Sequence, residues 1–394
     1  MQISKIKVNN FKSLVDFEID LAKFNCIIGL NGSGKSTFLQ FVSFLSQLMK
    51  GNVSSWFQKR KWETEDIVSH FDGKTNKTIH FEIQFQCDSQ KGAWVCDYLV
   101  GENCSVFEKF TLGDVVLEVY GHQEQQVGKY VFNGKRTEKI YFSYKGSIFS
   151  QLTDKEVTNA FEKVIRFFRN IHSFDQLSPY YLKQRSKSAG GSIGFGGEDL
   201  ASFLFELQDN PRVGIIGKIK AVYPEFNSFF PSPHPDGTKQ LTITEQYRNG
   251  NMPYSVPARI ANDGVLRIIA MIAQLSAKTH FLLFDEIENG INPELVGFLL
   301  DELTHTEKQV VVTTHSPLIL NYLNDETAIP GVHFFYKTPE GFTRTVPFLS
   351  VPEMREKLEV MGPGEAFIDT NLTELANRLS LVPKNAAQME RKEG

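Results

Sequence analysis

The chain has 394 residues, enough for about two or three ordinary domains or for one nucleotide-binding domain with inserted lobes. Apolar residues make up 41% of it and include 33 phenylalanines, so large packed cores can form. The net charge of −4 excludes a global field that attracts nucleic acid. No apolar run approaches the ~20 residues of a membrane span. The N-terminus lacks a signal-peptide pattern, and the four cysteines contain no C-x-x-C pair. These features argue against a structural zinc site and predict a cytoplasmic protein that does not use a membrane.

The first 50 residues predict two strands, a glycine loop and a helix. Apolar and polar residues alternate over 3–8 and 17–21, an apolar run covers 25–28, and apolar residues recur at helical spacing over 38–49. Between the last two lies Gly29-Leu-Asn-Gly-Ser-Gly-Lys35-Ser36-Thr37, which fits the phosphate-loop pattern G-x-x-x-x-G-K-[ST] without a mismatch. A chance glycine turn is the alternative, but a strand before the loop and a helix after it are the context that the motif requires.

The glycines of this loop let backbone N–H groups surround a phosphate, and the helix N-terminus adds partial positive charge. Lys35 is predicted to reach the β- and γ-phosphates, and the Ser36 hydroxyl to ligate Mg²⁺. The predicted ATP-binding residues are Gly29, Asn31, Gly32, Ser33, Gly34, Lys35, Ser36 and Thr37.

The middle of the chain predicts an antiparallel subsheet followed by helices. The expected strands cover 78–86, 93–100, 115–120, 129–132 and 139–144. A helix is expected over 154–170 with Thr153 as its cap, then a loose glycine-rich loop over 183–198, short helices over 199–209 and 212–222, and a strand over 241–246. Basic clusters at 59–61 and 183–187 are read as ordinary solvated surface, and salt-dependent DNA binding would contradict that reading.

An alternating α/β pattern returns near residue 258. Buried strands are expected over 279–284 and 309–313, helices over 266–277, 293–304 and 317–323, and a hairpin over 333–336 and 343–348. The first of these strands ends in Asp285 and Glu286, where a phosphate-loop ATPase places an acidic residue facing Mg²⁺. Asp285 is predicted to hold the ion, directly or through water, and Glu286 to orient or deprotonate the attacking water. His315 follows the next strand, where it can contact the γ-phosphate or hold that water.

The order of these motifs resembles the ABC-type ATPase heads of the SMC, RecF and OLD superfamily, and so does the opening Ile-Lys-Val-Asn-Asn-Phe-Lys-Ser13. The resemblance implies a head split by an insertion, with ATP held between two heads arranged head-to-tail. The stretch from Asn289 to Pro293 then corresponds to the D-loop, which crosses the dimer interface.

The resemblance also implies a signature segment that donates to the partner's γ-phosphate, here Asn262, Asp263 and Gly264. Asn262 replaces the usual serine, and an amide can donate to phosphate as a hydroxyl does. Gln151 occupies the position expected for the Q-loop.

The expected fold is therefore α/β: an ABC-type P-loop ATPase head, with a mixed sheet, helices, an antiparallel β subdomain and a helical or loop insertion. The expected parts are lobe I with the phosphate loop (1–150), the insertion (151–250), and lobe II with the signature, the Asp285 strand, the D-loop and His315 (251–394).

Three functions remain open at this stage. The first is a dimeric ATPase that senses or gates for a separate nuclease or toxin, as in the stand-alone ATPases of Septu-, retron- or PARIS-like anti-phage defence systems that this compact head resembles. The second is a RecF-like DNA-binding ATPase in DNA repair, and the third is a transporter subunit. ATP and Mg²⁺ are the expected cofactors, a homodimer or higher homo-oligomer is the expected assembly, and DNA or RNA remains open as a ligand.

Overall fold

The computed structural model of this chain describes residues 1–71, 76–121, 127–174, 177–247 and 252–381. The chain divides into two compact units, one formed by Met1–Ile171 with Asp325–Gly394 and the other by His172–Asn324. In the part of the chain that the structure describes, no helix is long and apolar enough to cross a membrane.

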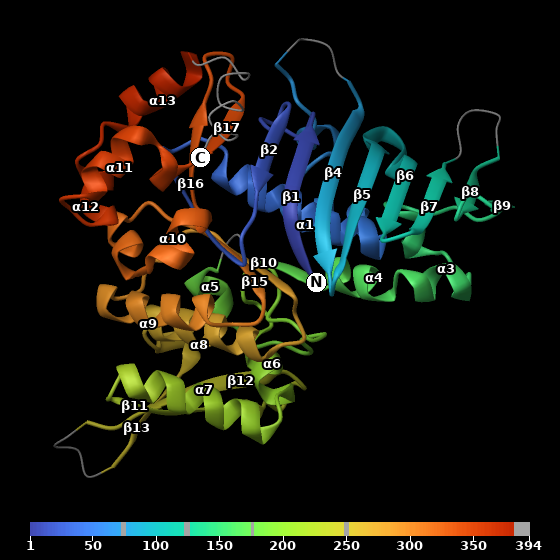
Figure 1. Ribbon diagram of the computed structural model, residues 1–394. Helices are drawn as coiled ribbons and strands as arrows, with labels where there is room; N and C mark the ends of the chain where they lie inside the picture. Colours follow the sequence, from blue (N-terminus) through green and yellow to red (C-terminus); the bar gives the residue numbers. More distant parts are fainter. Residues whose placement is uncertain (72–75, 122–126, 175–176, 248–251, 382–394) are drawn as a thin grey trace. The chain divides into compact units, whose positions relative to one another are not determined.

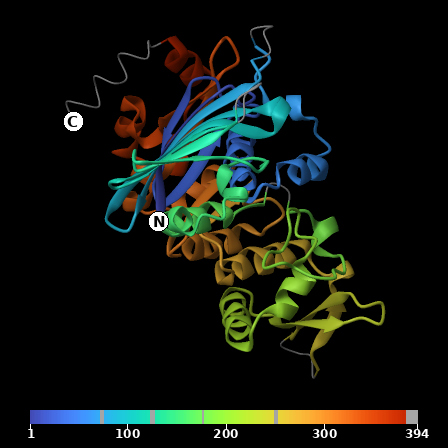
Figure 2. The ribbon, with the colours of Figure 1, turned by 90° about the vertical axis from the view of Figure 1, so that its right-hand side faces the viewer.

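An antiparallel sheet dominates the first unit (Figure 1). It has eight strands in the order β2-β1-β4-β5-β6-β7-β8-β9. The strands are β1 (Gln2–Asn9), β2 (Phe17–Asp20), β4 (Thr78–Cys87), β5 (Gln90–Leu99), β6 (Cys104–Leu112), β7 (Val115–Tyr120), β8 (Lys129–Phe132) and β9 (Arg136–Lys139). All neighbouring strands pair antiparallel, which confirms the predicted subsheet. Figure 2 shows the twist that such a sheet acquires.

Helix α1 (Lys35–Lys50) packs on this sheet through aromatic side chains. Phe41 meets Phe81 of β4 with ring centroids 5.8 Å apart, and Phe44 meets Tyr98 of β5 at 5.1 Å. These rings are completely or almost completely buried. Because truncating such a buried ring typically costs ~3–5 kcal/mol, this core holds α1, and with it the phosphate loop, in a fixed position.

A second group of strands in the first unit carries the phosphate loop. Strand β3 (Phe24–Gly29) is buried at every position and pairs parallel with β16 (Val332–Lys337). Strand β17 (Thr343–Pro347) pairs antiparallel with β16, which confirms the predicted hairpin. The other helices of this unit are α2 (Val53–Arg60), α3 (Lys155–Ala160), α4 (Glu162–Arg169), α10 (Asp325–Gly331), α11 (Pro352–Leu358), α12 (Pro363–Ile368) and α13 (Leu372–Leu381).

The second unit contains two buried parallel strands, β14 (Phe281–Phe284) and β15 (Gln309–Thr313), with β10 (Ile171–Phe174) on the other side of β14. A separate antiparallel sheet is formed by β11 (Phe226–Pro233), β12 (Lys239–Glu245) and β13 (Tyr254–Pro257). Its helices are α5 (Pro179–Leu182), α6 (Leu200–Glu206), α7 (Asp209–Val222), α8 (Asp263–Ser276) and α9 (Pro293–Thr304).

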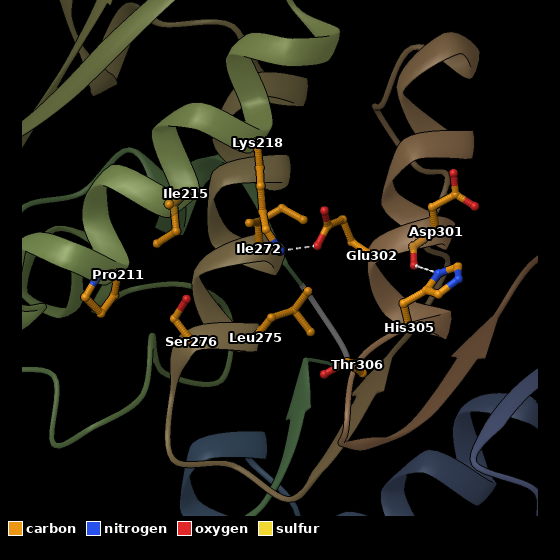
Figure 3. Close-up of a pocket in the computed structure, with 11 residues that line it drawn as sticks. Pro211, Ile215, Lys218, Ile272, Leu275, Ser276, Asp301, Glu302, His305 and Thr306 are labelled. Atoms are coloured by element: carbon orange, nitrogen blue, oxygen red, sulfur yellow. Dashed lines mark hydrogen bonds and ion pairs between the residues drawn. The ribbon is translucent and has the colours of Figure 1, made fainter.

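Helices α7, α8 and α9 line an open cavity of about 480 Å³ (Figure 3). Ile215 of α7 and Ile272 and Leu275 of α8 supply its apolar wall. Lys218 of α7 forms an ion pair with Glu302 of α9 across the cavity. Both charges are thereby neutralised where α7 meets α9.

Three local predictions need correction. The helix expected over 154–170 is broken at Phe161 into α3 and α4, and its cap is Asp154 rather than Thr153, because the Asp154 carboxylate accepts from the N–H groups of Glu156 and Val157. The strand expected over 139–144 is wrong: residues 140–144 form no strand, and the strand that pairs with β8 is β9, which ends at Lys139 and begins at Arg136 because Asn133 and Gly134 turn the chain in the left-handed region. Strands β6, β10, β11 and β13 were not predicted.

Strand β6 escaped prediction because it buries a carboxyl group. Glu108 is completely buried and points into the core beside Phe110. Its oxygens accept from Trp94 Nε1 at 3.1 Å and from the Ile148 backbone N–H at 2.8 Å. Burial raises the pKa of Glu108 to about 7, although these hydrogen bonds act in the opposite direction.

The raised pKa of Glu108 predicts a pH-dependent stability. Between its ordinary pKa of 4.5 and about 7, the carboxyl stays protonated in the folded chain but ionises in the unfolded chain. The free energy of unfolding should therefore fall as pH rises through this window, by on the order of 3 kcal/mol. In Glu108→Gln, urea titrations at pH 5 and pH 8 should lack this component. An identical pH dependence in both proteins would contradict the assignment.

Candidate nucleotide-binding site

The phosphate loop joins β3 to α1 and leaves the first turn of α1 without a side-chain cap. Lys35 is buried, and its Nζ donates to the carbonyls of Gly29 at 2.8 Å and Leu30 at 3.1 Å. Uncapped N–H groups at a helix N-terminus, with an ammonium group folded over the same loop, form an anion-binding arrangement. The hydroxyl-bearing Ser36 lies exposed in the first turn of α1.

Thr343 of β17 supports the loop, and no feature of the sequence indicated this role. The Thr343 hydroxyl donates to the Ser33 carbonyl at 2.9 Å and lies 2.8 Å from the Ser13 hydroxyl. A Cβ at Gly34, where φ is +105°, would lie 2.1 Å from this same hydroxyl. Gly34 is therefore required both for its backbone conformation and for the approach of β17.

Gln151, the predicted Q-loop residue, lies away from the phosphate loop. It follows a short 3-10 helix, Ile148–Ser150. Ser150 lies close to Gly51 at the far end of α1, since a Cβ added at Gly51 would be 2.8 Å from the Ser150 Cβ. Because α1 has 16 residues, its two ends are separated by roughly 24 Å. We therefore leave Gln151 out of the proposed site.

The second unit places Asp285 and Glu286 at the carboxyl end of β14. Thr313, the last residue of β15, fixes both: its hydroxyl donates to the Asp285 carboxylate and accepts from the Glu286 N–H at 2.9 Å. Glu286 has a φ of +48°, an uncommon conformation for a residue other than glycine. Such strain persists only where the surrounding structure enforces it, and it is concentrated at functional sites.

His315 follows β15 and lies close to the same turn. Its backbone N–H donates to Glu288 Oε1 at 2.8 Å, while its side chain is exposed. Asn289 donates from its side chain to Glu286 Oε2 at 3.3 Å. The second unit therefore brings together four predicted residues: Asp285, Glu286, Asn289 and His315.

The predicted signature segment lies beside the predicted D-loop. Asn262 is the N-cap of α8, and its side-chain oxygen accepts from the N–H groups of Gly264 at 2.9 Å and Val265 at 3.2 Å. A Cβ at Gly264 would lie 2.7 Å from the Gly290 carbonyl. Asp263 instead forms an ion pair with Lys183 at 2.5 Å.

Arg267 is a buried cation that sequence reasoning missed. Its side chain is 8% exposed, and its Nε has no hydrogen-bond partner among the described residues. It lies beside Gly290. Burial lowers the pKa of Arg267, whereas the nearby carboxylates of Asp263 and Glu286 act in the opposite direction. The positive charge of Arg267 in α8 and the negative charge of Glu286 therefore attract each other.

The donors present fit Mg²⁺ chemically. Asp285 supplies carboxylate oxygens and Ser36 a hydroxyl oxygen, and both are hard ligands. Mg²⁺ usually takes about one or two carboxylates from the protein and fills its shell with phosphate oxygens and water.

Two family models match the chain in these regions. Residues 1–188, which contain the phosphate loop, match the model described as "AAA ATPase domain". Residues 254–321, which contain Asn262, Asp285 and His315, match the model described as "AAA domain, putative AbiEii toxin, Type IV TA system". None of the curated proteins matches. Both sequence matches are to P-loop ATPase domains.

Solved structures of SMC heads are similar to the chain. An SMC head bound to the C-terminal winged-helix domain of ScpA matches with a TM-score of 0.53 and 15% identity, covering 88% of this chain and 98% of that one. A head domain from Thermotoga maritima has a TM-score of 0.43 and 15% identity, covering 88% and 99%. A head with an extended coiled coil, bound to the C-terminal domain of ScpA and derived from Pyrococcus furiosus, has a TM-score of 0.49 and 14% identity, covering 91% and 99%.

The two sequence matches make the chain similar to P-loop ATPase domains. More particularly, the first SMC head shows the chain to have the fold of an ABC-type ATPase head, which confirms the predicted fold class.

The close approach of α8 to the D-loop predicts that Gly264→Ala destabilises the protein. The added methyl would meet the Gly290 carbonyl at 2.7 Å, and forced overpacking of this kind costs about 1–3 kcal/mol. Gly217→Ala in α7 is the matched control: nothing lies within 4 Å of its added methyl, so it should stabilise by about 0.5–1 kcal/mol. Urea unfolding measures both, and a Gly264→Ala protein as stable as wild type would show that this approach is not close.

Proposed function

We propose that this chain hydrolyses ATP as a head-to-tail dimer and reports its nucleotide state to a separate effector protein, a nuclease or a toxin. The observation that supports the proposal is that each unit holds in a fixed arrangement a set of groups that an ATP site uses. The first unit offers the uncapped start of α1 with Lys35, and the second offers Asp285 and Glu286, both fixed by Thr313.

ATP binding in this proposal uses the charges of the phosphate loop. Lys35 exchanges its loop carbonyls for the β- and γ-phosphates, and the N–H groups of the first turn of α1 surround them. Ser36 and Asp285 hold Mg²⁺, which neutralises phosphate charge when it is bound.

Glu286 is the proposed base, and it orients or deprotonates the attacking water. Its left-handed conformation and the hydrogen bond from its N–H to Thr313 hold its backbone, and its carboxylate accepts from the Asn289 side chain. His315 is proposed to contact the γ-phosphate or to help hold the water.

Asn262 is proposed to act on the ATP of the second copy. Because its side-chain oxygen caps α8, the amide nitrogen remains as its donor, and this nitrogen makes no hydrogen bond with the described residues. The capping hydrogen bonds therefore fix the orientation of the exposed Asn262 amide at the start of α8. Asp263, Gly264 and Asn289 are proposed to accompany it at the dimer interface.

The effector part of the proposal rests on the match of residues 254–321 to a model whose description names a toxin system. We propose anti-phage defence in the cytoplasm as the setting and segment 151–250 as the surface that meets the effector. Affinity purification of the full chain under native conditions should then recover a nuclease or toxin in stoichiometric amount. Recovery of the chain alone would contradict this part.

A RecF-like DNA-binding ATPase in DNA repair is the second candidate. The observation that favours it is the cavity lined by Lys183, Arg185 and Arg259 in the second unit. An affinity for duplex DNA that does not fall as the salt concentration rises would exclude this candidate, and so would the absence of binding at low salt.

Substituting Glu286 separates ATP binding from hydrolysis. Glu286→Gln keeps the size of the side chain but cannot accept a proton, so it should bind ATP, turn it over about 100-fold more slowly or worse, and accumulate an ATP-bound dimer. Lys35→Ala is the control and should lose ATP binding without unfolding. Calorimetry, phosphate release and light scattering provide the readouts. Wild-type turnover by Glu286→Gln would move the base to another residue, with His315 the next to test.

Mixing two inactive variants tests whether the site is shared between copies. Asn262→Asp keeps the oxygen that caps α8 but replaces the amide donor with a negative charge, whereas Asn262→Ser keeps both a cap and a donor. Lys35→Ala and Asn262→Asp should each be inactive, and their mixture should recover part of the activity because one intact composite site forms per heterodimer. Asn262→Ser should stay active. No recovery, despite demonstrated subunit exchange, would contradict the sandwich.

A further inference from the structure

A second cavity in the second unit has the chemistry of a phosphate site. It has a volume of about 570 Å³ and lies between α5, the β11–β12–β13 sheet and the 3-10 helix Ala258–Ile260. This volume falls in the range of roughly 300–1,000 Å³ that small-molecule sites occupy. Its lining residues are Tyr180, Lys183, Gln184, Arg185, His234, Gln240, Leu241, Pro257, Ala258 and Arg259.

The charged side chains that line this cavity are all basic. Lys183 pairs with Asp263 at 2.5 Å, and Arg185 with Asp236 at 3.0 Å, but neither carboxylate lines the cavity. Arg259 is exposed and has no ion pair or hydrogen bond with the described residues. An uncompensated guanidinium group beside two further cations favours an anion, and guanidinium groups bind phosphate in bidentate geometry.

The backbone holds these cations in place. Ser186, next to Arg185, pairs with Lys239 at the start of β12, with hydrogen bonds of 3.1 and 2.7 Å. The buried Ser186 hydroxyl also exchanges hydrogen bonds with Ser202 of α6. The basic cluster at 183–187, which the sequence suggested was ordinary surface, is therefore built partly into the wall of a cavity.

The same cavity offers a surface for a base. Tyr180 lines it and is 69% exposed, and its ring meets that of Tyr181 edge-on at 5.3 Å. Stacking of a nucleobase on an exposed aromatic ring, combined with cations for the phosphate, is a common mode of nucleotide recognition. Gln184 and Gln240 add amide donors and acceptors for a base or sugar.

We propose that the cavity lined by Tyr180, Lys183, Arg185 and Arg259 is a second binding site, separate from the phosphate loop, for the phosphate of a nucleotide. The nucleotide is either free or part of a single strand, because the two share this chemistry.

A ligand bound in this cavity affects the segment that reaches the ATP of the second copy, an inference that rests on the proposed function. Lys183 holds Asp263 at the start of α8, and Arg259 lies three residues before Asn262. A phosphate that draws Lys183 away from Asp263 changes the segment proposed to reach the second ATP. The ligand would thus regulate ATP hydrolysis.

The test uses the full chain carrying Lys35→Ala, so that nucleotide bound at the phosphate loop does not obscure the second site. The probes are AMP, a 5′-phosphorylated 12-nucleotide oligo(dT), and adenosine as the control without phosphate, all titrated by calorimetry. Arg259→Glu is compared with Lys187→Glu, which makes the same charge change at an exposed lysine outside the cavity. Circular dichroism checks folding, and Arg259→Gln replaces Arg259→Glu if the latter is unstable.

We expect AMP or the oligonucleotide to bind, adenosine not to bind, Arg259→Glu to weaken binding by about tenfold or more, and Lys187→Glu to change it less than about twofold. Binding of AMP assigns the site to a free nucleotide, and binding of the oligonucleotide alone assigns it to a strand. Failure of both probes, or an equal loss in both variants, would overturn the proposal. Neither outcome depends on whether the wild-type chain hydrolyses ATP, so the two proposals fail separately.

Discussion

The start of α1 has no side-chain cap, and the rest of the first unit holds this turn in place. The helix begins at Lys35 with Gly34 as its N-cap residue, and a helix N-terminus of this kind attracts an anion. Keeping that turn rigid requires a fixed helix, and the rings of Phe41 and Phe44 provide it by packing on the sheet. It also requires a braced loop, which Thr343 supplies through the Ser33 carbonyl. The aromatic core and the C-terminal strands therefore hold one helix turn in place, the turn proposed to bind the phosphates of ATP.

The second unit holds the neighbouring residues Asp285 and Glu286 in defined positions at the end of β14. The Thr313 hydroxyl holds the Asp285 carboxylate by donating to it and holds the backbone of Glu286 by accepting from its N–H. Glu286 has a left-handed backbone, and the buried cation Arg267 lies on the neighbouring helix α8. Asn262 caps α8, and Gly264 in the first turn of that helix lies against the Gly290 carbonyl. The unit is thereby preorganised, which reduces the reorganisation that catalysis would otherwise require.

Sequence reasoning predicted the motifs and missed the contacts that support them. The phosphate loop and the ends of β14 and β15 could be predicted because each is a short pattern on a buried strand. Strand β6 was missed because Glu108 occupies a core position, which breaks the alternation of apolar and polar residues. Thr343 could not be found, since it meets Ser33 only after 310 residues of intervening chain. Gln151 was predicted as the Q-loop residue from its position along the chain alone. In the structure, the length of α1 separates it from the phosphate loop.

The central claim is that two copies share each ATP, and ATP-dependent cross-linking tests it most directly. Asn31 in the phosphate loop and Asn262 at the start of α8 are both exposed. One chain carries Asn31→Cys and the other Asn262→Cys, both in the Glu286→Gln background, and a short bis-maleimide joins cysteines that come close. The account predicts a covalent heterodimer with ATP and Mg²⁺ that is absent without nucleotide and absent when either new cysteine is omitted. A yield that is the same with and without ATP, or no cross-link at saturating ATP, would contradict it.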